Sequence, residues 1–154
     1  MAYRKVSDDV RGVILVIAKD RRREVKVVTI KAGYARGGHM HSYPESFFVV
    51  SGTLKYFNGS EMSHTERDVT PGDSVETDTG VPHMFIAETD SVLLEITPAG
   101  AYDAEPYPPW RKLVKDLMGR QIHVPRKPGA VRGGCRRRRD KDGPGGDRGR
   151  CRRP

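Results

Sequence analysis

The chain has almost no cysteine and no long apolar segment. Its two cysteines, Cys135 and Cys151, lie in the last twenty residues of a 154-residue sequence, which excludes a disulfide scaffold for the rest of the chain. The apolar run Val13 to Ala18 is followed at once by KDRRR. It is much shorter than the roughly 20 residues that span a bilayer and does not have the form of a signal peptide. We therefore expect a cytoplasmic protein without a membrane segment.

Charge is distributed unevenly along the chain. Residues 126–154 carry 12 Lys and Arg but only 3 Asp, a local balance of +9, whereas the whole chain has a formal charge of +8. The first 125 residues are therefore close to neutral, which argues against a globally basic nucleic-acid-binding domain. We expect one domain over 1–125 and a disordered basic tail over 126–154, because the tail has almost nothing apolar to bury. Weak binding of nucleic acid or another polyanion would reside in that tail.

Short β-branched runs separated by turn residues dominate the first hundred residues. This spacing predicts an all-β domain, either an antiparallel barrel or a double-sheet jelly roll. Residues 3–10 are expected as an edge strand or an arm, 33–38 as a loop and 60–68 as a polar surface loop, with a turn at Asn58-Gly59. The continuously apolar 47–50 predicts a strand covered on both faces. The other predicted strands are 13–18, 25–30, 54–57, 74–77, 83–88 and 91–97.

The pattern changes after Pro98. Apolar residues recur at helical spacing, which predicts one amphipathic helix over about 108–119. Two prolines suit its first turn and Gly119 suits its end. The apolar stripe indicates packing against the outside of the barrel or against a second subunit; a partner-binding groove is the alternative. The stripe comprises Trp110, Leu113, Val114, Leu117 and Met118.

Candidate metal ligands cluster in the stretch GYARGGHMHSYPESFFVVSG. His39 and His41 are two residues apart, so on a strand both imidazoles point to the same face. Glu45 adds a carboxylate nearby, and His83 is a more distant candidate that a small barrel would bring close. An isolated histidine pair is more often an ordinary feature of a strand, and this alternative stays open on the spacing of the pair alone.

The wider spacing resembles the first motif of the cupin family. Gly33, His39, His41, Glu45 and Gly52 stand at its fixed positions, and the second motif is matched in part by Gly72, Gly80 and His83. The resemblance covers roughly residues 10–98. It implies a cupin-type antiparallel β-barrel in which a metal is held by His39, His41, Glu45 and His83.

Three imidazoles and one carboxylate suit a single divalent transition metal. Fe, Mn, Ni, Zn and Cu all accept such ligands, whereas Ca and Mg prefer oxygen shells. Four protein ligands leave open coordination positions for water or substrate. Tyr34, Arg36 and Tyr43 flank the ligands and are candidates for substrate binding, Arg36 because its guanidinium suits a carboxylate or phosphate. Exposed loop positions are the alternative for all three.

Two classes of function follow. The first is an enzyme acting on a small polar metabolite, such as a sugar nucleotide or keto acid, by metal-dependent isomerisation, dioxygenation or decarboxylation. Asp9 to Gly12, Arg36 to His39 and Tyr102-Asp103 resemble features of cupin sugar-nucleotide ketoisomerases and epimerases. The second is a non-catalytic cupin that senses a small ligand, with the basic tail as a polyanion arm. The resemblance to small single-barrel cupins also implies a homodimer.

Overall fold

The computed structural model describes residues 3–119, which form eleven strands and one helix. The strands are β1 Arg4–Asp9, β2 Gly12–Lys19, β3 Arg23–Ile30, β4 Ala35–Met40, β5 Glu45–Ser51, β6 Leu54–Ser60, β7 Ser63–Val69, β8 Ser74–Thr77, β9 His83–Ala87, β10 Ser91–Pro98 and β11 Glu105–Pro106, and the helix is α1 Pro108–Gly119.

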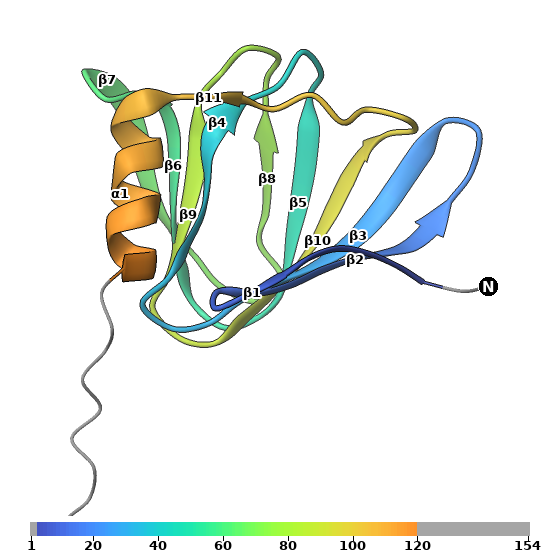
Figure 1. Cartoon of the computed structure of the whole chain (residues 1–154), viewed down its shortest axis with the longest axis horizontal. Helices are drawn as coiled ribbons and strands as arrows, with labels where there is room; N and C mark the ends of the chain where they lie inside the picture. Colours follow the sequence, from blue (N-terminus) through green and yellow to red (C-terminus); the bar gives the residue numbers. More distant parts are fainter. Residues whose placement is uncertain (1–2, 120–154) are drawn as a thin grey trace, which may run out of the picture. The chain divides into compact units, whose positions relative to one another are not determined.

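The strands make two antiparallel sheets that face each other (Figure 1). One sheet has six strands in the order β1-β2-β3-β10-β5-β8, and the other has five in the order β11-β4-β9-β6-β7. Every strand pair is antiparallel. The predicted all-β, double-sheet architecture with one C-terminal helix is therefore confirmed, and β1 is an edge strand as expected.

The interior between the sheets has an apolar end and a polar end. Strand β3 explains why, because alternate residues of a strand share a face. Val28 and Ile30 face the interior and are 3% and 1% exposed, and Lys26 and Glu24 lie on the same face two and four residues before Val28, at 7% and 1%. The apolar end continues into the main core. Its other buried members are Phe47, Val49, Leu54, Tyr56, Val69, Val75, Phe85, Ala87 and Leu93.

Helix α1 packs on the five-stranded sheet over β4. Trp110 and Val114 are buried against Ala35 and Met84, which confirms the prediction that the apolar stripe packs against the sheets. The approach is close at Gly38. A Cβ on this residue would lie 3.0 Å from the backbone of Trp110 and Arg111, so only glycine allows the helix to lie this near the strand.

The prediction of a surface loop over 60–68 is wrong. Strand β7 pairs with β6 along its whole length, and the turn lies at Glu61 and Met62 rather than at Asn58-Gly59, which belong to β6. Every residue of β7 except Val69 is exposed. The strand was missed because an edge strand with solvent on both faces needs no apolar alternation, and charged residues are common on such edges.

Two further expectations about strands need correction. Residues 47–50 are buried on one face only, since Phe48 and Val50 are 43% and 46% exposed. The glycines before the histidines do not form a loop up to residue 38, because β4 already begins at Ala35 and pairs with β9. Gly37 and Gly38 have positive φ, at 99° and 73°, and mark an irregularity of pairing within that strand.

The predicted cytoplasmic location and the predicted basic tail are not tested by the described part of the chain. Within residues 3–119, the single helix is too short to cross a bilayer, and a cytoplasmic location stays a prediction. The tail predicted over 126–154 lies outside the described residues.

Candidate metal centre

Three strands bring the four predicted ligands together at the polar end of the interior. His39 lies on β4 directly opposite His83 on β9, because the two residues are cross-strand partners. Glu45 opens β5 in the facing sheet, and His41 follows the end of β4. Their ligand atoms all lie within 4.8 Å of one another, so these residues form a group that could hold a metal ion. Glu45 and His83 are buried, and the other two are half-buried.

The nitrogen atoms of two imidazoles face the carboxylate. His41 Nε2 is 3.3 Å from Glu45 Oε1, and His83 Nε2 is 3.0 Å from Glu45 Oε2. The three imidazole rings are also close, with centroids 4.5 Å apart for His39 and His41 and 4.9 Å apart for His39 and His83. The cluster therefore presents several electron-pair donors to one small volume.

Hydrogen bonds on the far side of two rings define which nitrogen faces the site. His41 Nδ1 contacts the carbonyl oxygen of Asp103, and His83 Nδ1 is 3.4 Å from the carbonyl oxygen of Val81. A carbonyl can only accept, so Nδ1 carries a proton in each ring, and the neutral form of each imidazole directs the lone pair of Nε2 into the cluster. Carbonyl contacts of this kind commonly orient histidines that bind metals.

Burial opposes positive charge at His39. Desolvation, followed by the neighbouring His83 and His41, lowers the pKa of His39 to about 3. Its imidazole is therefore neutral near pH 7, which is the form that binds a metal. Burial also raises the pKa of Tyr43, whose hydroxyl donates to the carbonyl oxygen of Asp103 at 3.3 Å. Tyr43 is thus a neutral hydroxyl beside the cluster.

The residues present fit a divalent metal. Glu45 Oε2 is buried and accepts no hydrogen bond among the described residues, although such an oxygen is costly to leave without a partner. A proton on His83 Nε2, 3.0 Å away, would satisfy this oxygen alone. A metal ion between neutral imidazoles and the carboxylate satisfies all the donors at once.

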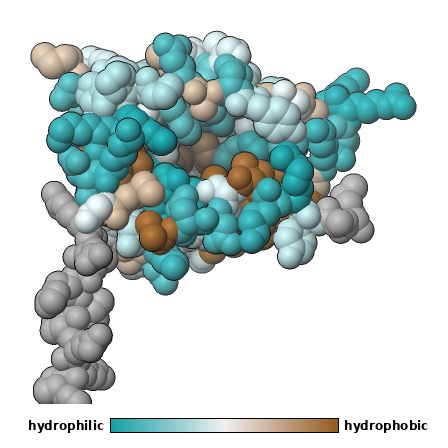
Figure 2. All heavy atoms as spheres, in the orientation of Figure 1, coloured by the Kyte–Doolittle hydropathy of each residue, from teal (hydrophilic) through white to brown (hydrophobic). Residues whose placement is uncertain are grey.

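A cavity of about 290 Å³ lies next to the cluster. Figure 2 shows a hollow on the face of the molecule seen there, with hydrophilic side chains beside it and more hydrophobic atoms at its depth. The wall contains apolar core residues as well as charged groups from both sheets and from α1. The charged or hydroxyl-bearing wall residues outside the ligand set are Ser7, Arg11, Lys26, Arg36, Tyr43, Glu95, Tyr102 and Arg111.

The three residues predicted to bind substrate differ in position. Tyr43 and Arg36 both line the cavity. Arg36 is 6% exposed and donates to the carbonyl oxygens of Thr29 and Gly12, at 3.1 and 2.8 Å, so two of its donors already join β4 to the other sheet. Tyr34 is not among the wall residues and packs against the main core. A substrate role for each of the three remains a prediction.

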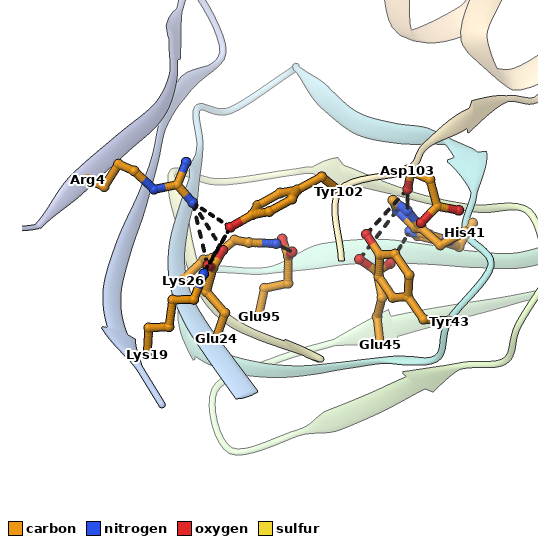
Figure 3. A network of polar contacts seen from close by, with 11 residues as sticks. Arg4, Lys19, Glu24, Lys26, His41, Tyr43, Glu45, Glu95, Tyr102 and Asp103 are labelled. Carbon is orange, nitrogen blue, oxygen red and sulfur yellow. Dashed lines mark hydrogen bonds and ion pairs between the residues drawn. The ribbon is translucent and has the colours of Figure 1, made fainter. Parts of the chain in front are cut away.

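Sequence reasoning missed a buried ion pair in the cavity wall. Lys26 on β3 and Glu95 on β10 are cross-strand partners, and the Lys26 ammonium contacts the Glu95 carboxylate. Burial raises the pKa of Glu95, which Lys26 partly offsets. Figure 3 shows this pair between the metal-site residues and a second network, in which Tyr102 donates to Glu24 at 3.0 Å. The alternation in REVKVVTI would by itself turn Val25 and Val27 inward and Lys26 outward, so no local signal in the sequence places this pair inside.

The two facing sheets and the internal histidine and glutamate cluster define a class of small β-sandwich protein. A family model for the cupin domain matches residues 26–97, a span that includes all four cluster residues. The stretch from residue 26 to residue 97 therefore matches a cupin domain, in agreement with the resemblance found in the sequence. A comparison with curated protein sequences gives no match.

Solved structures share the fold at low sequence identity. The capsular polysaccharide assembling protein CapF from Staphylococcus aureus is 22% identical with a TM-score of 0.58, over 69% of this chain and 32% of that one. A deletion mutant of Bacillus subtilis oxalate decarboxylase is 17% identical with a TM-score of 0.61, over 70% and 30%. An uncharacterized Klebsiella pneumoniae protein with a double-stranded β-helix domain is 16% identical with a TM-score of 0.56, over 65% and 89%. The chain therefore matches about a third of the first two proteins, and these likenesses establish the fold alone.

Proposed function

We propose that this protein is a metal-dependent enzyme that acts on a small polar metabolite. In this proposal His39, His41, Glu45 and His83 hold one divalent transition metal. The observation that carries it is the buried carboxylate of Glu45, whose two oxygens face imidazole nitrogens at 3.3 and 3.0 Å while Oε2 accepts no hydrogen bond within residues 3–119. An ordinary pair of strand histidines would not require this arrangement.

A bound divalent metal would polarise a carbonyl or hydroxyl oxygen of the substrate. The side chains of the cavity would do the remaining work. Tyr43 is a neutral hydroxyl beside His41, with ring centroids 4.8 Å apart, and would donate to a substrate oxygen by turning its proton away from the carbonyl oxygen of Asp103. Glu95 is the candidate proton-transfer group, because it faces the same cavity and burial favours its protonated form.

The pair of Lys26 and Glu95 supports a functional interior rather than a purely structural one. Their side chains are only 9% and 12% exposed. A buried ion pair is often no more stabilising than apolar residues of the same size, so stability alone does not account for its presence between the sheets. Retention of the pair for binding or proton transfer explains it better.

Among the structurally similar proteins are enzymes, including hydroxypropylphosphonic acid epoxidase from S. wedmorenis and B. subtilis oxalate decarboxylase, the latter described with Mn(II) centres. At identities of 18% they support a catalytic use of this fold but do not select a reaction. Isomerisation, dioxygenation and decarboxylation remain the candidate reactions, with Fe, Mn, Ni, Zn or Cu as the metal.

The test is turnover by protein of defined metal content. Separate preparations loaded with each of the five metals would be screened against small keto acids, hydroxy acids and sugar nucleotides, with product formation followed by mass spectrometry. We expect turnover that Glu45→Gln abolishes and that His64→Ala, a change at an exposed histidine on β7, leaves intact. Metal-dependent ligand binding without turnover would instead favour the sensor. The proposed polyanion arm concerns residues outside the described range and stays a prediction.

We also propose that the chain forms a homodimer through the outer face of the six-stranded sheet. Leu15, Val27, Leu94 and Phe48 are successive cross-strand partners there, and within residues 3–119 the only helix packs on the other sheet. Phe48→Asp should shift the mass measured by light scattering from dimer to monomer, whereas Met62→Asp, at a 92% exposed turn residue, should not. A monomeric wild type at micromolar concentration would contradict this.

A further inference from the structure

Four cationic side chains stand in the wall of the cavity beside the metal centre. They come from three different parts of the fold, the edge of the six-stranded sheet, the inner strands and the helix. The four are Arg11, Lys26, Arg36 and Arg111. Their partners decide which of them is available to a ligand.

Three of the four are already engaged. Arg11 binds Asp9 through two hydrogen bonds, Nε to Oδ1 at 3.0 Å and Nη2 to Oδ2 at 2.7 Å. Lys26 contacts Glu95, and Arg36 donates to two backbone carbonyl oxygens. Arg111 differs, because its guanidinium makes no ion pair and no side-chain hydrogen bond within residues 3–119. Among the four cations of the wall, it is the one whose charged group has no partner in this part of the chain.

The packing of α1 brings Arg111 to this position. The fit against Gly38 sets the backbone of Arg111 beside the residue that precedes His39. Arg111 and all four residues of the cluster line the same cavity, so a small ligand can contact both. The first turn of α1 contains no acidic residue. A cation close to a helix N-terminus is electrostatically unfavourable, which a bound anion would offset.

We propose that Arg111 binds the carboxylate of a small carboxylic acid substrate, whose other oxygen-bearing end faces His39, His41, Glu45 and His83. This inference rests on the proposed function and adds the substrate class to it. An Arg guanidinium offers a planar fork that matches a carboxylate. The cavity of about 290 Å³ lies at the lower limit of about 300–1,000 Å³ for ligand sites. That volume suits a keto or hydroxy acid of a few carbon atoms and is too small to enclose a sugar nucleotide.

Calorimetric titration of the manganese-loaded full chain tests the inference. The probes are pyruvate, its uncharged analogue methyl pyruvate, and phosphate. We expect the wild type to bind pyruvate more tightly than either of the others. Arg111→Ala should weaken pyruvate binding at least tenfold and leave methyl pyruvate unchanged, because a hydrogen bond to a charged group is worth a factor of that order. Arg111→Lys should fall between the two, since it keeps the charge but loses the fork.

Two controls keep the outcome unambiguous. Lys115→Ala removes an exposed cation from the same helix and should leave binding unchanged. Metal content and thermal unfolding are measured on every sample, so that a wild type without metal contradicts the proposed function, whereas full metal content with equal pyruvate affinity in Arg111→Ala contradicts this inference alone. Tighter binding of phosphate than of pyruvate, or no binding of any probe at millimolar concentration, would also overturn it.

Discussion

The two ends of the space between the sheets are built by the same strands and yet differ completely in chemistry. On β3 and β10, Val28 and Leu93 are cross-strand partners at the apolar end, and Lys26 and Glu95 are partners one step further along the same inner face. One end is an apolar core, the other holds a buried ion pair and the histidine cluster, and residues of both ends line the cavity. The pairing register of β3 with β10 therefore positions both the apolar side chains that stabilise the fold and the charged side chains that we assign to function.

The comparison indicates how stability and function are divided. Burial of apolar side chains stabilises by about 25 cal/mol per Å² removed from water, so the apolar end should carry most of the folding free energy. Buried charges contribute little or oppose folding unless they are fully paired. We therefore expect changes at the apolar end to lower stability while sparing metal binding, and changes at the polar end to do more to metal and ligand binding.

Removing a side chain from the apolar end should give the largest loss of stability. Leu93 is completely buried, and Leu93→Ala should lower the free energy of unfolding by about 2–5 kcal/mol, as for other buried leucines. Metal content of the folded protein should stay at the wild-type value. Met62→Ala, at a turn residue that is 92% exposed, is the control and should cost clearly less in urea unfolding. Equal losses would show that the interior is not the main source of stability.

Removing one or both members of the buried ion pair should show how much of the stability at the polar end comes from charge and how much from packing. Lys26→Met leaves Glu95 without its partner, and the expected loss is about 3 kcal/mol. The double change Lys26→Met with Glu95→Leu removes both charges and should recover most or all of that loss. Urea unfolding of the single and double variants measures both effects. A double variant as unstable as the single one would mean that the pair itself stabilises the polar end.

Acid should destabilise the metal-free protein through His39. The pKa of His39 is about 3 in the folded chain, because of burial, against 6.5 for the free side chain. Below pH 6.5 the unfolded chain therefore binds a proton that the folded chain excludes, and stability falls as the pH falls from 6.5 toward 3. The slope from this group is at most about 1.4 kcal/mol per pH unit. His39→Asn should reduce the slope in urea unfolding, and His64→Asn should not.

Much of the polar end was predictable because its residues lie at fixed sequence spacing. His39, His41 and Glu45 fall within seven residues, and the pairing of β4 with β9 supplies His83. The β-rich architecture and the bounds of α1 also followed from periodicity and turn residues. The physical reason is that alternation along a strand and helical spacing are local properties.

The rest depended on pairings between distant strands. Lys26 and Glu95 are 69 residues apart in sequence, so their contact follows only from the pairing of β3 with β10. Arg111 enters the cavity wall because α1 packs against Gly38, and helical periodicity alone does not specify which strand a helix covers. Strand β7 was missed for the opposite reason, because an exposed edge strand carries little apolar signal.

Measuring metal content is the most direct test of whether the cluster of three histidines and Glu45 is a metal centre. Elemental analysis of the wild type, of His41→Ala and of the control His64→Ala would be carried out after identical loading and desalting. We predict one divalent metal ion per chain in the wild type and the control, and loss of most of the metal in His41→Ala. Wild-type metal content in His41→Ala, with the fold intact, would contradict the assignment of the cluster as a metal centre.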